Sequence, residues 1–174
     1  MFIAHAPAGY LLTRKLARHP SAGLLMLGLV ASVLPDLDLV RFYVIDHRRV
    51  LHHAYWTHEP FWWALLGLAW LVFASLRGSR RLILAGHVFF ANVLGHLVLD
   101  SVAGRIRWLA PFSERSFALV SVPARLPWWV SNFLFHWTFL LEVAITAWAV
   151  WTWRRAAGAA RAPPRPAVPA TPAR

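Results

Sequence analysis

Long apolar runs alternate with short polar segments along most of this chain. Four such runs cover residues 21–40, 60–76, 81–102 and 128–153. The last two are long enough to cross about 30 Å of hydrocarbon, because an α-helix rises about 1.5 Å per residue. The first two are shorter, so they would cross the membrane with little tilt or where the bilayer is locally thinner. The pattern predicts an all-α integral membrane bundle with four long apolar helices.

The N-terminal segment predicts a further helix, from about residue 3 to residue 18. His19 and Pro20 mark a turn after it, so this helix is expected to pack antiparallel to the run that starts at residue 21. His5 and Asp36 lie at nearly equal distances along the chain from that turn. Since both helices rise equally per residue, the hairpin predicts that His5 meets Asp36.

The C-terminal segment, residues 156–174, is rich in Pro, Ala and Arg and has few large apolar residues. Such a segment buries too little apolar surface to fold, so it is predicted to be a disordered tail. Residues 1–155 are then expected to form one membrane-embedded helical domain.

The charge pattern supports a membrane protein. Of 174 residues, 59% are hydrophobic, yet the formal net charge is +11. The basic residues stand in short clusters beside the apolar runs, at 14–18, 77–81 and 154–155, where they indicate topology rather than nucleic-acid binding. The three clusters share one side if each run crosses once. That side, with the C-terminus, is predicted to be cytoplasmic, in a multi-pass protein of the bacterial inner membrane whose surroundings are lipids.

The chain has no cysteine, so any metal must be bound by His, Asp or Glu. In the predicted topology, three groups of such residues reach the periplasmic face: Asp36 with Asp38, the histidines of residues 46–60, and His96 with Asp100. The last two are four residues apart, so they stack on one side of a helix and can bind one ion together. Charged groups at membrane depth are costly and usually mark function. The convergence predicts a metal centre at this face.

Each group also has a simpler interpretation. The "HLVLD" pair could be a hydrogen bond inside the bundle, "PDLD" a helix end with solvated carboxylates, and the histidine-rich segment a polar interfacial loop. Their shared position favours the metal centre over these three readings. His136 and Glu142 in the last run do not stack on one helical face, and they are expected to be second-shell groups or additional ligands, or, for Glu142, a structural hydrogen-bonding group.

In this order, the residues resemble the bacterial family of membrane-bound, metal-dependent hydrolases of the inner membrane. The resemblance covers about residues 1–111, through an early histidine, a "PDxD", a histidine pair and an "HxxxD". It implies the metal ligands His5, Asp36, Asp38, His53, His58, His96 and Asp100. His47 and His52 are then extra groups near the metal. The chain departs from the family at Ala54, where arginine is usual, and Arg48 is a candidate to bind an anion in its place.

This set of histidines and carboxylates exceeds what one tetrahedral zinc needs and suits a two-metal centre. Zinc is expected first, and manganese or iron next. Such a centre would activate water, with Asp36, Asp38 or Asp100 bridging the ions or accepting the proton. Arg105 and Arg107 could bind a phosphate or lipid headgroups.

The expected function is therefore a membrane-bound hydrolase of a phosphate ester or lipid-type ester, an amphiphilic substrate that reaches the site from the bilayer surface. Two other classes stay open. A metal transporter or sensor would use the same ligands without chemistry and would place polar groups through the membrane depth. A structural or regulatory membrane protein would close the ligand shell around its metal. The sequence leaves the oligomeric state open.

Overall fold

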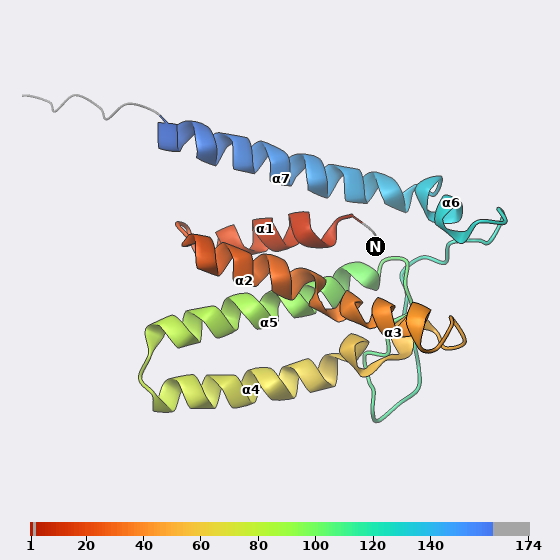
Figure 1. The fold of residues 1–174 in the computed structure, drawn as a ribbon, viewed down its shortest axis with the longest axis horizontal. Helices are drawn as coiled ribbons and strands as arrows, with labels where there is room; N and C mark the ends of the chain where they lie inside the picture. Colours follow the sequence, from red (N-terminus) through yellow and green to blue (C-terminus); the bar gives the residue numbers. More distant parts are fainter. Residues whose placement is uncertain (2, 162–174) are drawn as a thin grey trace, which may run out of the picture.

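The computed structural model describes residue 1 and residues 3–161; most of these residues are helical, and none of them forms a strand (Figure 1). An isolated antiparallel bridge joins Ile106 to Phe117. The α-helices are α1 (His5–Leu16), α2 (Ala22–Val33), α3 (Asp38–Val44), α4 (Pro60–Leu76), α5 (Arg80–Asp100), α6 (Trp129–Leu134) and α7 (Thr138–Arg161). Three short 3-10 turns are η1 (Leu34–Leu37), η2 (His52–Ala54) and η3 (Trp56–His58). The predicted all-α class is confirmed.

The first two helices form the predicted hairpin. Ser21 begins α2 by accepting a hydrogen bond from the Leu24 N–H at 3.2 Å, as serine commonly does at a helix N-terminus. α5 packs against both α1 and α2, α4 packs against α5, and α7 packs along α1 (Figure 1). At the open end of the hairpin, His5 Nε2 lies 4.0 Å from Asp36 Oδ2. The predicted meeting of these two side chains is confirmed.

Two segments are long and apolar enough to cross a membrane, Ala22–Val44 and Arg80–Asp100. Only 28% and 33% of their most apolar stretches are buried, whereas a core helix of a water-soluble protein is mostly buried. α4 is apolar but shorter. The predicted arrangement of four membrane-spanning helices is thus not confirmed.

The last apolar run is not one helix but two, α6 and α7. The Thr138 N–H donates to His136 Nδ1 at 3.4 Å, and the Thr138 hydroxyl lies 2.9 Å from the same nitrogen. Such local side-chain bonds compete with the backbone bonds of a continuous helix. α7 then extends to Arg161, so residues 156–161 are helical instead of belonging to the tail. Residues 162–174 of the predicted tail lie outside the described residues.

The three basic clusters lie at one end of the bundle, and the loops that carry most of the acidic residues lie at the other. The C-terminal end of α1, the turn between α4 and α5, and the C-terminal half of α7 share the basic end (Figure 1). This is the arrangement that the topology prediction required. Which end faces the cytoplasm stays a prediction.

A layer of small and polar side chains lets α1, α2 and α5 approach closely. Thr13, on α1, accepts a hydrogen bond from Asn92 Nδ2 at 3.1 Å, and both residues are buried. Gly28 of α2 faces this pair: a Cβ there would lie 1.9 Å from Thr13 Oγ1. Small residues commonly allow helices to pack this closely in membrane proteins.

Replacing Gly28 by alanine is expected to destabilise the bundle by about 1–3 kcal/mol, because Thr13 must move and its bond with Asn92 weakens. Thermal unfolding in detergent, followed by circular dichroism, measures the effect. Gly23→Ala is the control, since a Cβ at this position of the same helix meets nothing within 4 Å. Equal melting temperatures for the two variants would contradict the proposed packing.

Candidate metal centre

The predicted ligands come together where α2, α5 and the loops before α4 converge. Pro35 lies in the 3-10 turn η1, because proline cannot donate the N–H that a continuing α-helix needs. This turn carries Asp36, and Asp38 then begins α3. His96 and Asp100 lie one turn apart at the end of α5, with His96 Nε2 3.0 Å from Asp100 Oδ2. The local structure thus brings the carboxylates of Asp36 and Asp100 close to the imidazole of His96.

A first group of four side chains could hold one ion: Asp36, His58, His96 and Asp100. One nitrogen or oxygen of each lies within 4.8 Å of the others. Asp100 Oδ2 is 3.6 Å from His58 Nε2, and Asp36 Oδ1 is 3.6 Å from His96 Nε2. All but Asp36 are buried.

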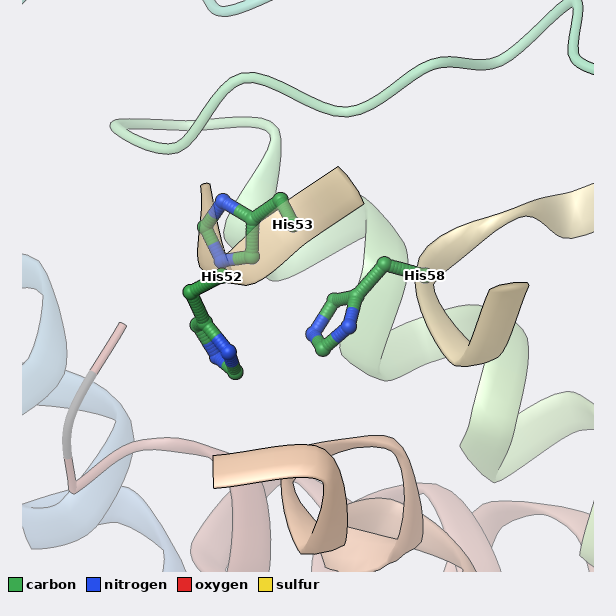
Figure 2. Close-up of side chains that lie close together, drawn as sticks. All are labelled: His52, His53 and His58. Atoms are coloured by element: carbon green, nitrogen blue, oxygen red, sulfur yellow. The ribbon is translucent and has the colours of Figure 1, made fainter. Parts of the chain in front are cut away.

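A second group consists of His52, His53 and His58, so the two groups share His58. Figure 2 shows the three side chains gathered between the two 3-10 turns that precede α4. Their ring centroids are 4.7 to 4.8 Å apart. Since His58 Nδ1 is bonded to Asp38, only its Nε2 atom can bind a metal, so the two overlapping groups could not both bind an ion through His58 at once.

His5 completes the cluster from α1. Its Nε2 atom lies 3.1 Å from Asp100 Oδ1, and its ring stacks on that of His96 at a centroid distance of 3.8 Å. The first and fifth helices thus meet through these three side chains.

Two histidines are oriented by the ring nitrogen that faces away from the cluster. His96 Nδ1 lies 2.8 Å from the carbonyl oxygen of Ser32, so it carries the proton and donates it there. His58 Nδ1 is bonded in the same way to Asp38 Oδ2 at 2.8 Å. In both rings Nε2 is left facing the carboxylates, which is how metal-binding histidines are usually held. Asp38 thus positions His58.

Thr57 helps to hold Asp38 and does not cap α4. The residue at the start of α4 is Glu59, whose side chain makes no capping bond. The Thr57 hydroxyl donates to Asp38 Oδ2, and its carbonyl accepts a hydrogen bond from Trp63 Nε1 at 2.7 Å. The Thr57 hydroxyl is therefore used to hold the Asp38 carboxylate and not to cap the helix.

Several buried atoms of the cluster form no hydrogen bond of normal geometry among the described residues, although most of them lie close to another polar atom. They are His5 Nδ1, Asp38 Oδ1, His52 Nδ1, His58 Nε2, His96 Nε2 and Asp100 Oδ2. A buried polar atom without a partner costs about 1–3 kcal/mol, so such atoms are rare. A bound cation would satisfy several of them at once. The nitrogen and oxygen donors fit zinc, manganese or iron.

The histidines of the loop differ in protonation. Burial lowers the pKa of His53 to about 3, so its ring is neutral at pH 7. Burial also disfavours the charged form of His58, but hydrogen bonds to Asp100, Asp36 and Asp38 outweigh it and raise the pKa to about 10. In the metal-free protein, His58 therefore keeps a proton that a metal must displace. Metal binding should release a proton and weaken as the pH falls.

Of the further groups expected near the metal ligands, the structure places His52 inside the cluster. His52 Nε2 is 3.3 Å from Asp36 Oδ1, and its Nδ1 is 3.1 Å from Asp38 Oδ1. His47, in contrast, is exposed in a left-handed turn with φ 45°. His136 bonds to Thr138 and lies outside both groups.

Glu142 is a structural anchor. It is 4% exposed and accepts hydrogen bonds from the backbone N–H groups of Ile3, at 2.6 Å, and Ala4, at 3.2 Å. The side chain thus caps the start of α1 from α7. Because α1 lacks a side-chain cap of its own, this contact fixes the segment that carries His5.

The three candidate anion-binding arginines have different surroundings. Arg107 donates to Glu59 at 2.6 Å and to Glu114 at 2.8 Å, so its charge is already balanced within the protein. Arg48 is exposed in the same left-handed turn as His47. Arg105 is exposed and lines a cavity beside the cluster, which leaves it the best placed of the three.

The cluster opens onto two adjoining cavities. An inner one of about 170 Å³ is lined by Asp36 and Asp100, and an outer one of about 430 Å³ by Arg105. Both are lined by His53 and Gly104. A Cβ on Gly104 would lie 2.3 Å from His53 Cε1. Any larger residue at position 104 would therefore displace the His53 imidazole, which lines both cavities.

A family model described as YdjM inner membrane protein matches residues 1–162. No curated protein and no solved structure matches the chain significantly.

Proposed function

The chain belongs to the YdjM inner membrane protein family, and we propose that it is a metal-dependent hydrolase of a phosphate ester or lipid-type ester. The observation that carries this proposal is the convergence of donor atoms from Asp36, His58, His96 and Asp100, all within 4.8 Å of one another and most of them buried, beside a cavity. Several of these atoms lie close together without forming a hydrogen bond of normal geometry among the described residues, and a bound cation would satisfy them.

The donor sets define what could be held. One divalent ion would lie among Asp36, His58, His96 and Asp100, and a second ion would need loop donors other than His58, such as His52 and His53. A bound divalent ion of this kind supplies Lewis-acid activation of water and of the ester oxygen.

The side chains of the chain would carry the other tasks. Ser32 and Asp38 hold the rings of His96 and His58 in the orientation that exposes Nε2. Asp38 is engaged by His58 and Thr57, whereas Asp36 is 27% exposed and lines the inner cavity. Asp36 therefore belongs with the candidate ligands of the first ion, and Asp38 with the groups that position His58.

The outer cavity suits an amphiphilic ester. Leu51 and Phe133 give it apolar walls, and Arg105 gives it a cation. A phosphate near Arg105 would place a neighbouring ester bond toward His53 and the inner cavity. The apolar part of the substrate would lie against the apolar walls.

The polar groups along the middle of the helices favour an enzyme over a metal transporter. Asn92 donates to Thr13 and to the Val88 carbonyl, and His87 bonds to the carbonyl of Ile83 in its own helix. Glu142 accepts backbone N–H groups. These contacts serve the fold, and a transport path would need polar groups free to bind an ion along the membrane depth.

The proposal is tested by metal removal. The purified protein, loaded with zinc or manganese, is expected to hydrolyse chromogenic phosphate esters or a fluorescent phospholipid. Chelation should abolish the reaction, and adding the metal back should restore it. His96→Ala protein, purified in the same way, controls for contaminating hydrolases. If the metal-loaded protein hydrolyses none of these esters, or does so no faster than His96→Ala protein, the catalytic proposal is wrong.

A further inference from the structure

A groove between α1 and α7 lies at the basic end of the bundle, away from the metal centre. Its volume is about 570 Å³. Leu11 and Leu12 line it from α1, and Ile145 and Trp148 line it from α7. The two helices run side by side in the same direction (Figure 1). This is an elongated apolar site of the kind that suits a hydrocarbon chain.

One end of the groove is strongly basic. Arg14 and Lys15, in the last turn of α1, line it directly. Thr152 lines it on α7, and Arg154 and Arg155 follow at once in the sequence. Cations from two distant parts of the chain thus meet at the end of an apolar groove. The negative end of the α1 dipole offsets only about half of one positive charge.

No side-chain carboxylate of the described residues pairs with these cations. The seven acidic side chains are Asp36, Asp38, Asp46, Glu59, Asp100, Glu114 and Glu142. Three belong to the metal centre, three lie in its loops, and Glu142 caps the start of α1, at the opposite end of that helix from Arg14 and Lys15. A bound anion would supply the counter-charge that these side chains do not.

We propose that this groove binds an anionic phospholipid. One acyl chain lies along Leu11, Ile145 and Trp148, and the phosphate of the headgroup lies at Arg14 and Lys15. An inner membrane protein is surrounded by such lipids, and basic pockets between membrane helices commonly bind their headgroups. The site is independent of the proposed hydrolase, because none of its lining residues belongs to the metal centre.

Tryptophan quenching tests the site, since Trp148 lines the groove and is 59% exposed. The full chain in detergent is titrated with phosphatidylglycerol or phosphatidylcholine that carries brominated acyl chains, which quench indole fluorescence on contact. We expect phosphatidylglycerol to reach half-maximal quenching at a concentration at least about tenfold lower. Trp148→Phe should remove this quenching component. Equal quenching by the two lipids would overturn the proposal.

Two sets of variants separate a defined site from general surface charge. Arg14→Gln with Lys15→Gln should raise the half-saturating phosphatidylglycerol concentration about tenfold. Arg80→Gln with Arg81→Gln removes the same charge from exposed positions at the same end and should change it less than about twofold. Equal effects of the two pairs would overturn the proposal.

Ile145→Trp keeps every charge and narrows the groove, so it tests the apolar part of the site. It should also raise the half-saturating concentration. Unchanged lipid binding by a folded Ile145→Trp protein would overturn the proposed position of the acyl chain, and with it the site.

Discussion

Replacing His58 by alanine is expected to remove all bound metal. His58 is the residue that the two candidate groups share, and it is fully buried. Its Nε2 atom faces Asp36 at 3.8 Å and Asp100 at 3.6 Å. Without this imidazole, each group loses one of its few donors, and the carboxylates repel one another in a medium of low dielectric constant. Metal analysis of the purified variant should find less than about a tenth of the wild-type content.

His47→Ala is the matched control for this variant. His47 belongs to the same histidine-rich loop but is exposed and outside both groups, so its metal content should equal that of the wild type. His53→Ala should give an intermediate result, because His53 belongs to the second group alone. If His47→Ala and His58→Ala lose metal equally, the loop binds metal without the geometry described above.

Replacing Asp100 by asparagine is expected to reduce hydrolysis at least about a hundredfold. The buried Asp100 carboxylate lies 3.1 Å from His5, 3.0 Å from His96 and 3.6 Å from His53. Asparagine keeps the shape of the side chain and removes the charge that attracts a cation. The rate of ester hydrolysis at saturating metal, measured beside the metal affinity, tests this expectation.

Asp46→Asn is the control for the loss of one carboxylate, because Asp46 pairs with Arg41 and Tyr55 and lies outside both groups and both cavities. Its hydrolysis rate should stay within about twofold of the wild type. A fully active Asp100→Asn protein would refute the assignment of Asp100 to the reaction.

Much of the site geometry could be predicted from helical spacing. The equal rise of two helices from one turn predicts that His5 meets Asp36, and four-residue spacing predicts the contact of His96 with Asp100. Both inferences depend only on regular helix geometry. They hold because α1, α2 and α5 are regular between the turn and the site.

The parts that could not be predicted lie where the helices are irregular. His52 joins the cluster through the 3-10 turn η2, which the spacing of its histidines does not reveal. The role of Gly104 depends on a contact with His53, in a distant loop. Hydropathy likewise predicts one helix for residues 128–153. It depends only on the apolar character of the residues and does not detect the side-chain bonds between His136 and Thr138, at the point where α6 ends and α7 begins.

The resemblance to metal-dependent hydrolases and the structure give Asp38 different roles. The resemblance treats Asp38 as a ligand equal to Asp36. In the structure, Asp38 holds His58 Nδ1 and the Thr57 hydroxyl, while Asp36 faces the cluster and the cavity. We therefore assign Asp38 to positioning His58. That the centre faces the periplasm stays a prediction.

The central claim is that the clustered histidines and aspartates form a metal centre, and the metal content of the wild-type protein tests it most directly. The full chain is purified in detergent from cells grown with ample zinc, manganese and iron, and is analysed by inductively coupled plasma mass spectrometry. We expect one to two equivalents of a divalent transition metal per chain, and almost none in Asp36→Ala and His96→Ala proteins that remain folded. A folded wild-type protein without stoichiometric metal after this purification would contradict the account.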